Sequence, residues 1–253
     1  HHVAASGKSI QPVSSFLGLN NASAGNVMWG ATIITDQVGM YAGLFAHTDY
    51  EGDKYAGSSP KLISKWLYNK ISDTDTRKTA WWDANNAAVP YVQEKVKFAD
   101  VQTWMGDYVW MRVEEMYLIA AEAECRLGDE AAAKEDLKAL MRQRDPNYTA
   151  ADNKTGTALG ALTTDETGSL LEEIILQRRI ELWGEAGRVW DIRLLKQGFR
   201  RTEDMGWPSN ALLSTRPTDN PENYMWVLTI PQAEFDGNEN LDQDKHQNPT
   251  GDE

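Results

Sequence analysis

Helical periodicity between Met111 and Asp145 constrains the fold of this chain more than any other part of its sequence. Gly128 supplies a left-handed stop, and Asp129 is placed to cap a following helix. The sequence therefore predicts two antiparallel helices with a two-residue link. The apolar stripe of the first comprises Val113, Met116, Ala120, Ala123 and Leu127, and that of the second comprises Ala133, Leu137, Leu140 and Met141.

Small residues follow the link at Ala132 and Ala133, a pattern that resembles half of a tetratricopeptide repeat, where small side chains let paired helices approach closely. The chain then turns polar between Asn147 and Thr167, which predicts a surface loop. Helical spacing resumes near Ser169, and Gly184 and Gly187 predict close packing or a helix break. The expected fold class is predominantly α.

Charged residues in this later helix are spaced for ion pairs. Arg178 precedes Glu181 by three positions, and Glu185 precedes Arg188 by three. Residues at that spacing lie side by side on a helix. We expect these charges to set the packing register and to have no role in chemistry.

The sequence from Gly25 to Asp107 predicts mainly loops and short strands, because its apolar runs, such as Val27 to Trp29, are short. The segment from Pro60 to Asn69 is the exception, because its apolar residues follow helical spacing. Lys95 to Phe98 alternates like a short strand. We expect a loop-rich part over 26–110 and a helical scaffold over 111–253.

Residues 1–25 are rich in Ser, Asn and Gly and lack clear periodicity, so we expect a flexible segment; His1-His2 suggests a tag remnant or a cut end. No run of about eighteen apolar residues suggests a membrane span. The formal net charge of −13 argues against nucleic-acid binding, which needs clustered Lys and Arg. The single cysteine, Cys125, lies in an apolar helical pattern and is expected in the core.

Several short blocks resemble the SusD/RagB family, and they occur in the family's order. Gln177 and Ala186 depart from the family pattern, where Glu and Gly are usual, and extra residues separate Asn240 from Gln247. The blocks are Asn26 to Trp29; Ile71 to Arg77 with Trp81; Lys97-Phe98; Met111-Arg112, Glu115 and Ala121 to Ala123; Arg142 to Arg144 with Pro146; Ile175 to Asp191; Ile230 to Gln232 with Glu234; and Gln247 to Pro249.

This resemblance implies a SusD-like fold and a function. Members of the family are non-catalytic glycan-binding lipoproteins of the outer membrane and cell surface, and they partner SusC-like TonB-dependent transporters. The resemblance covers the C-terminal portion of a family member, from about residue 26 to 253. It implies membrane association only through an N-terminal lipid anchor, which this sequence does not contain. The identity of the glycan stays open, and a peptide ligand is compatible too.

Glycan binding calls for aromatic rings under the apolar faces of a sugar and for polar groups at its hydroxyl edges. Six of the ten tryptophans lie in the loop-rich part, where large rings more often face a ligand. Trp183, Trp190 and Trp226 are expected in the core. His47 is expected to be exposed without binding ligand. The predicted ligand-binding residues are Trp81, Trp82, Asn85, Tyr41, Tyr55 and Trp66.

The acidic stretch from Asp236 to Gln247 places oxygen-bearing side chains at alternate positions, as in a calcium loop. Its sixth position is Leu241 in place of Gly, and its twelfth is Gln247 in place of Glu. A solvated acidic loop is the alternative interpretation, and no other cofactor is expected. The candidate Ca²⁺ ligands are Asp236, Asn238, Asn240 and Asp242.

Two other functional classes stay open. The sequence lacks the common zinc-protease, serine-hydrolase and phosphate-loop motifs, so we expect no enzyme. Glycoside hydrolysis needs only two carboxylates, and nothing in this acidic sequence marks a particular pair. A helical protein-interaction adaptor is the other alternative, with the aromatic loops serving protein contact.

Overall fold

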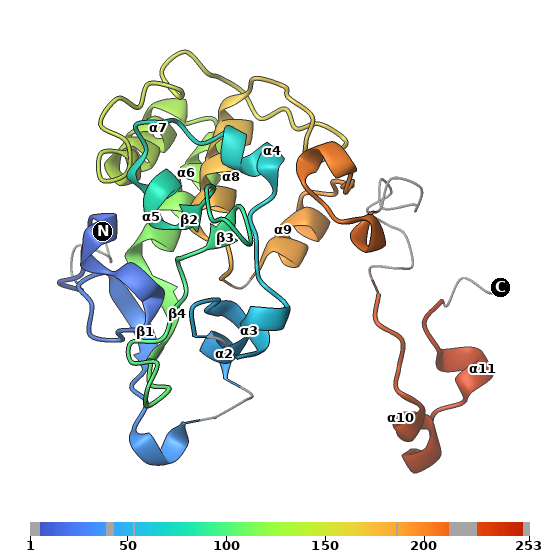
Figure 1. Ribbon diagram of the computed structural model, residues 1–253. Helices are drawn as coiled ribbons and strands as arrows, with labels where there is room; N and C mark the ends of the chain where they lie inside the picture. Colours follow the sequence, from blue (N-terminus) through green and yellow to red (C-terminus); the bar gives the residue numbers. More distant parts are fainter. Residues whose placement is uncertain (1–5, 39–42, 53, 186, 213–226, 250–253) are drawn as a thin grey trace. The chain divides into compact units, whose positions relative to one another are not determined.

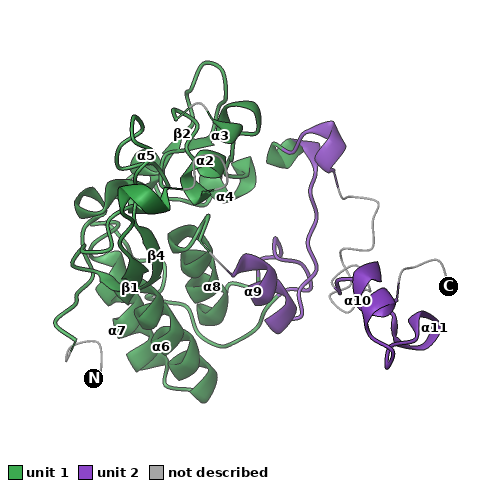
Figure 2. Cartoon of the chain, turned by 90° about the horizontal axis from the view of Figure 1, so that it is seen from below, with its two compact units in different colours: residues 1–159, 167–186, 204–206 green, residues 160–166, 187–203, 207–253 purple. Residues whose placement is uncertain are grey.

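The computed structural model describes residues 6–38, 43–52, 54–185, 187–212 and 227–249 (Figure 1). These residues divide into two compact units (Figure 2). Unit 1 comprises residues 1–159, 167–186 and 204–206, and unit 2 comprises residues 160–166, 187–203 and 207–253. Among the described residues, no helix is both long and apolar enough to cross a membrane.

The described residues are predominantly helical, as predicted, with short strands confined to unit 1. Strands β1 (Val27–Ala31) and β4 (Tyr108–Arg112) form one antiparallel pair, and β2 (Trp82–Asp83) and β3 (Val92–Gln93) form another. The helices of unit 1 are α2 (Leu44–Thr48), α3 (Tyr55–Ser58), α4 (Lys65–Asn69), α5 (Thr76–Ala80), α6 (Val113–Leu127), α7 (Glu130–Met141) and α8 (Leu170–Glu181); those of unit 2 are α9 (Arg188–Leu194), α10 (Gln232–Gly237) and α11 (Gln243–His246).

Helices α6 and α7 form the predicted pair. Gly128 adopts the left-handed conformation that ends α6, with φ of 87°. The Asp129 carboxylate then accepts a hydrogen bond from the Ala132 amide at 3.1 Å and caps α7. The stripe of α7, comprising Ala133, Leu137, Leu140 and Met141, is fully buried. Local capping and periodicity were therefore sufficient to predict this pair.

The stripe predicted for α6 packs differently from that of α7. Helix α6 buries Leu118, Ala121 and Cys125, so the expectation for Cys125 is confirmed. In contrast, Ala123 and Leu127 from the predicted stripe are exposed. The helix is apolar on more than one side, and periodicity alone does not tell which side is buried.

The N-terminal segment contributes to the core of unit 1. Val13, Phe16 and Leu19 are buried, and the ring of Phe16 lies 6.2 Å from that of Trp81 in an edge-on arrangement. The prediction of a flexible segment over residues 1–25 is therefore wrong from Val13 onward. Its apolar residues lack periodicity because two short 3₁₀ helices, Val13–Ser15 and Leu17–Leu19, present them.

Two local predictions in the first region are also corrected. The helix predicted from Pro60 begins only at Lys65, because Leu62 pairs with Val92 as an isolated β-bridge and Ser64 caps α4. The strand predicted at Lys95 to Phe98 is absent from these described residues. Its neighbour β3 ends at Gln93, and the Lys95 side chain is buried among charged groups.

The predicted break after α8 is confirmed. Helix α8 begins after its cap Ser169 and ends at Glu181, and Gly184 has φ of 74°. In unit 2, α9 follows Gly187, whose φ is 120°. Trp190 on α9 is 67% exposed, so its predicted place in the core is wrong, whereas Trp183 is partly buried against the core of unit 1. Trp226 lies outside the described residues.

Candidate functional site

Trp29 and Trp110 form an exposed aromatic pair on the ribbon of β1 and β4, which lie side by side in Figure 1. The two ring centroids are 5.0 Å apart and the ring planes are inclined at 57°. The two residues are 61% and 54% exposed. Large apolar rings gathered at a surface mark an interaction site more often than isolated ones do. We call Trp29 and Trp110 the aromatic pair.

Irregular strand pairing gives the ribbon its shape. Val27 lies opposite Arg112 and Trp29 opposite Met111, but Gly30 lies opposite Val109, so the register shifts on both sides of Trp29. Such bulges re-aim side chains. A Cβ atom at Gly30 would lie 2.6 Å from the Tyr108 carbonyl oxygen, so only glycine permits this approach of the strands.

Hydrogen bonds fix the ribbon at both ends. Near Ala31, the Asp107 carboxylate accepts bonds from the amides of Ala22 at 2.9 Å and Ile33 at 3.0 Å. At the other end, Asn26 Nδ2 donates to Glu114 Oε1 at 2.9 Å, and Asn26 is fully buried. The aromatic pair therefore lies on a backbone that is held from both sides, which lowers the cost of ordering the rings when a ligand binds.

A buried ion cluster anchors the inner end of the ribbon. Glu181 lies at its centre: Oε1 accepts from Arg112 Nη1 at 2.6 Å and Arg144 Nη2 at 3.0 Å, and Oε2 accepts from Arg77 Nη1 at 3.0 Å and Arg144 Nε at 2.9 Å. Four side chains from four segments thus meet without solvent. The cluster consists of Asp75, Arg77, Lys95, Arg112, Glu114, Arg144, Glu181 and Glu185.

The acidic and basic groups of the cluster balance one another. Burial alone would raise the pKa of Glu181, but the Arg144 and Arg112 guanidiniums hold it well below its usual range. Burial lowers the pKa of Lys95 to about 8, and Glu185 at 2.5 Å opposes that shift. The cluster has complete charge pairing, so it is suited to fixing structure and has no free acid or base.

The cluster joins residues from four of the sequence blocks that resemble the SusD/RagB family. Arg77, Arg112, Arg144 and Glu181 each lie in a different block, and all four side chains converge. The ion pairs of Glu181 therefore run to other elements, whereas Arg178 Nη2 lies 3.4 Å from Glu115. The predicted role of Glu181 in packing and ion pairing is confirmed. Its partners are Arg77, Arg112 and Arg144, however, and not Arg178 of its own helix, which was the expected partner.

Trp81 and Trp82 need correction as predicted ligand-binding residues. Each is only 1% exposed, and their rings pack edge-on at 5.9 Å. Trp82 also meets Trp183, and Lys95 Nζ lies 4.5 Å from the centre of a Trp81 ring. Rings enclosed in this way present no face to a sugar, so both belong to the core of unit 1.

The other predicted residues lie apart from this core. Tyr55 is 48% exposed and stacks on His47 with centroids 4.8 Å apart. Asn85 is exposed in a turn, and the half-buried Trp66 ring lies under the Arg179 guanidinium at 4.9 Å. Tyr41 lies outside the described residues. Ligand binding by Tyr55, Asn85 and Trp66 stays a prediction.

The predicted calcium ligands are exposed or half-buried in unit 2. Asp242 caps α11 by accepting from the Asp244 amide and pairs with Lys245 at 2.7 Å, whereas Asp236 accepts from Gln232. Within the described ranges, no three His, Cys, Asp or Glu side chains gather as a metal-binding group. Calcium binding by Asp236, Asn238, Asn240 and Asp242 therefore stays a prediction from the sequence.

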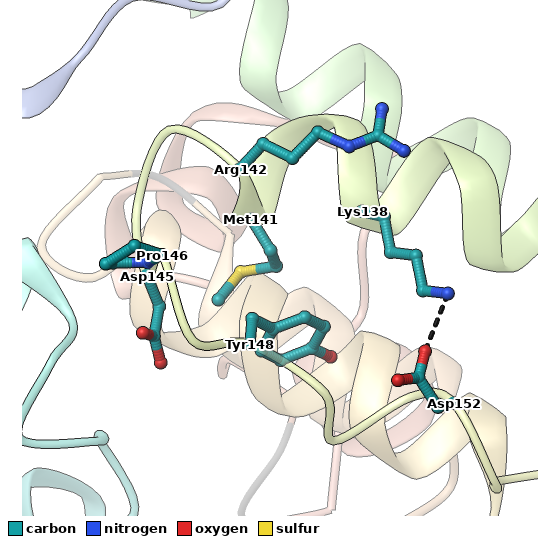
Figure 3. A pocket seen from close by; sticks show the side chains of 7 residues that line it. All are labelled: Lys138, Met141, Arg142, Asp145, Pro146, Tyr148 and Asp152. Atoms are coloured by element: carbon teal, nitrogen blue, oxygen red, sulfur yellow. Dashed lines mark ion pairs between the residues drawn. The ribbon is translucent and has the colours of Figure 1, made fainter.

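A surface pocket of about 290 Å³ lies beyond the end of α7 (Figure 3). Lys138 pairs with Asp152 at 2.6 Å on one side, and the Tyr148 hydroxyl donates to Glu173 at 2.8 Å. These polar groups already have protein partners, so the pocket is a weaker candidate than the aromatic pair. It is lined by Lys138, Met141, Arg142, Asp145, Pro146, Tyr148 and Asp152.

Trp29 and Trp110 were the functional candidates that sequence reasoning left unassigned. Each stands beside apolar neighbours in a short strand, so its local pattern resembles that of a core residue. Strict alternation along β4 would place Trp110 and Arg112 on the same face, yet Arg112 is buried and Trp110 is exposed. The bulged pairing with β1, which shifts register between Met111 and Val109, accounts for the difference and has no signal in the local sequence. That pairing joins strands far apart in the sequence.

Comparison with known proteins gives a consistent result. The model of the SusD family matches residues 47–249. None of the curated proteins shows a significant match.

Solved structures match the fold over nearly the whole chain. A SusD-like carbohydrate binding protein from Bacteroides vulgatus is 24% identical, with a TM-score of 0.69 over 96% of this chain and 53% of that one. A SusD superfamily protein from Bacteroides thetaiotaomicron is 21% identical, with a TM-score of 0.65 over 96% and 53%. One from Bacteroides fragilis is 17% identical, with a TM-score of 0.53 over 96% and 55%. The chain thus spans about half the length of these proteins.

Proposed function

Because the chain belongs to the SusD family, we propose that it binds oligosaccharides or polysaccharides and that the aromatic pair forms part of the contact. The exposed rings of Trp29 and Trp110, 5.0 Å apart on a fixed ribbon, are the observation that supports this proposal most directly. The relative from Bacteroides vulgatus is described as a carbohydrate binding protein, which supports the ligand class.

The geometry of the pair suits a carbohydrate. Sugars have apolar C–H faces that stack on aromatic rings, and their hydroxyl groups keep hydrogen bonds with water or polar side chains. Two rings inclined at 57° present two differently oriented faces to one chain of sugar units. Neither ring is enclosed in a deep cavity, so we expect modest affinity from each unit and a gain from binding successive units.

Titration with a panel of soluble oligosaccharides tests the proposal. The panel contains α-glucan and β-glucan oligomers, mucin-type glycans and N-glycans, and calorimetry measures binding. We expect saturable binding to at least one member, and the double variant Trp29→Ala/Trp110→Ala weakens it at least about tenfold, or about 1.4 kcal/mol. Trp190→Ala is the matched control, because Trp190 is an exposed tryptophan outside the pair.

The outcomes separate the site from the function. Binding that survives the double variant unchanged would contradict the role of the pair, and Tyr55→Ala would then test the stacked rings of His47 and Tyr55. If no member of the panel binds while a partner protein does, the chain is an adaptor. Near-ultraviolet circular dichroism establishes that each variant keeps its tertiary packing.

The proposal includes a role without catalysis. Glu114, a buried acid on α6, lies 3.1 Å from Arg144 and 3.2 Å from Arg112, so its charge is paired within the cluster. The Glu114 side chain is fully buried, so it does not meet the surface where a glycosidic bond would have to approach two carboxyl groups. A reducing-sugar assay on the bound oligosaccharide is expected to show no turnover, and measurable turnover would favour a hydrolase.

The proposal also extends to uptake. Membership of the family supports delivery of the glycan to a SusC-like TonB-dependent transporter and attachment to the outer membrane, at the cell surface, by a lipid anchor. Co-purification of the translated gene product with a transporter from outer-membrane extracts tests the partner. Protease treatment of intact cells tests surface exposure, because a surface protein is cleaved while cytoplasmic markers survive.

A further inference from the structure

The pocket beyond the end of α7 contains a buried carboxylate with one oxygen that has no hydrogen-bond partner. Asp145 is only 5% exposed, and its Oδ1 accepts hydrogen bonds from the Thr74 hydroxyl at 2.6 Å and the Asn147 amide at 3.0 Å. Within the described residues, no hydrogen bond reaches its Oδ2. A buried charge that lacks partners costs free energy. Because Asp145 lines the pocket, a donor group bound there can supply the missing bond.

A guanidinium with unused donors lies on the same pocket. Arg142 has five N–H donors, and in the part of the chain that the structure describes its side chain pairs only with Glu135, at 3.2 Å. Both side chains of that pair are about two-thirds exposed, at 64% and 66%, so the pair contributes little to stability and can be exchanged for a ligand. The other cation of the lining, Lys138, is already paired with Asp152 at 2.6 Å. Arg142 is therefore the better donor for an anionic group in the pocket.

An apolar surface completes the lining, and it is formed by Met141, Pro146 and Tyr148. The Tyr148 hydroxyl donates to Glu173 at 2.8 Å, which holds the ring in place. Figure 3 shows Asp145 and Pro146 at one end of the Tyr148 ring. The volume of about 290 Å³ lies at the lower end of the range for small-molecule sites, so the pocket is suited to one small ligand.

The charges of the lining indicate the class of that ligand. Two bases and two acids line the pocket, so a ligand of a single sign would meet repelling as well as attracting groups. A ligand with both charges can pair with both. A free α-amino acid carries an ammonium group and a carboxylate at neutral pH. A neutral sugar would donate a hydroxyl to Asp145 but would bring no charge for Arg142, and charge-assisted hydrogen bonds are the stronger ones.

We propose that this pocket binds a free α-amino acid with an apolar side chain, whose ammonium group donates to Asp145 and whose carboxylate accepts from Arg142. The apolar side chain packs on Met141, Pro146 and Tyr148. The lining residues do not include the aromatic pair, so this binding does not depend on the proposed glycan binding.

Leucine and two of its analogues test the charge requirement. The amine 3-methylbutylamine lacks the carboxylate of leucine, and 4-methylpentanoate lacks its ammonium group. Binding to the protein is measured at neutral pH by titration followed by nuclear magnetic resonance. We expect leucine to bind at least about tenfold more tightly than either analogue, because each analogue loses one charge-assisted contact. Galactose is the neutral comparison and should bind more weakly than leucine.

Two variants assign the charges to residues. Arg142→Gln should reduce leucine binding to the level of 3-methylbutylamine and should leave the binding of that amine unchanged. Asp145→Asn should reduce leucine binding to the level of 4-methylpentanoate, and its side-chain oxygen can still accept from Thr74 and Asn147.

Matched controls separate this site from other surfaces. Arg126→Gln removes another partly exposed arginine, which pairs with Glu122 on α6 away from the pocket, and should bind leucine as the original chain does. The Trp29→Ala/Trp110→Ala variant should also keep full leucine binding. Loss of leucine binding in that double variant would contradict a site separate from the aromatic pair.

The remaining outcomes decide the proposal. Absence of saturable leucine binding would overturn it, and so would equal binding of leucine and either analogue, or of leucine and galactose. Leucine binding that survives both Arg142→Gln and Asp145→Asn would lie elsewhere and would overturn it too. If near-ultraviolet circular dichroism shows that Asp145→Asn loses its tertiary packing, Arg142→Gln decides alone, because Arg142 is an exposed surface residue.

Discussion

At the scale of single residues, Glu181 is the acid at the centre of the buried ion cluster in unit 1. Its two oxygens accept four hydrogen bonds from three arginines, and the side chain is fully buried. Removing one partner of a buried network leaves the others charged and unpaired. Removing Glu181 should therefore lower the free energy of unfolding by much more than the net stabilisation that the ion pairs contribute.

Glu181→Ala is expected to lower the free energy of unfolding by about 3–5 kcal/mol. Urea denaturation followed by circular dichroism measures the change. The control is Glu135→Ala, because Glu135 forms a 3.2 Å pair with Arg142 in which both side chains are exposed, and that loss should be within about 0.5 kcal/mol. If Glu181→Ala changes the free energy of unfolding as little as the control does, the cluster does not anchor the ribbon.

The same residue predicts how stability depends on pH. The pKa of Glu181 in the folded chain lies well below the ordinary value of 4.5, because the surrounding arginines outweigh burial. The stabilisation is therefore complete above pH 4.5 and is lost as the pH falls toward the folded pKa, where the unfolded chain binds the proton more tightly. We expect the free energy of unfolding to fall below pH 4.5.

Acid titration of Glu181→Gln checks this assignment. The variant is less stable at neutral pH, but its free energy of unfolding should fall less steeply below pH 4.5 than that of the original chain. Glu135→Gln should keep the original slope, because its exposed pair with Arg142 is screened by solvent. An unchanged slope in Glu181→Gln would assign the acid sensitivity to other carboxylates.

At the scale of elements, the ribbon of β1 and β4 links the cluster to the candidate site. Arg112 ends β4 inside the cluster, and Trp110 lies two residues earlier on the exposed surface. Gly30 allows the close approach to Tyr108 that sets the spacing of the strands. The position of the rings therefore depends on backbone contacts that neither ring makes.

Gly30→Ala is expected to separate the strands, because the new Cβ atom would lie 2.6 Å from a backbone oxygen. Overpacking of this kind costs about 1–3 kcal/mol of stability. We expect weaker oligosaccharide binding as well, measured by calorimetry on folded protein. Gly237→Ala is the control, because no atom lies within 4 Å of its added Cβ and its φ is not positive. Full affinity in Gly30→Ala would show that ring spacing does not matter.

At the scale of the whole molecule, ligand binding should be visible as added stability. A ligand that binds only the folded state at a hundredfold excess over its Kd raises the free energy of unfolding by about 2.7 kcal/mol. We expect an oligosaccharide that saturates the original chain to produce this increase. The Trp29→Ala/Trp110→Ala variant should show a much smaller increase at the same concentration, whereas Trp190→Ala should match the original chain.

The sequence by itself determined the features that depend on residues a few positions apart. Periodicity predicted α6 and α7, Gly128 and Asp129 predicted the link, and Gly184 predicted the break after α8, because caps and left-handed turns are local. The order of the short blocks was sufficient to indicate the SusD family, which the family model then matched over residues 47–249.

Only the tertiary structure decided which side chains are enclosed and which meet solvent. Trp81 and Trp82 occur in a polar stretch yet are buried, whereas Trp29 and Trp110 occur in apolar strands yet are exposed. Likewise, Glu181 receives its arginines from segments up to about a hundred positions away. Burial and ion pairing depend on neighbours that distant segments bring, and no local pattern contains that information.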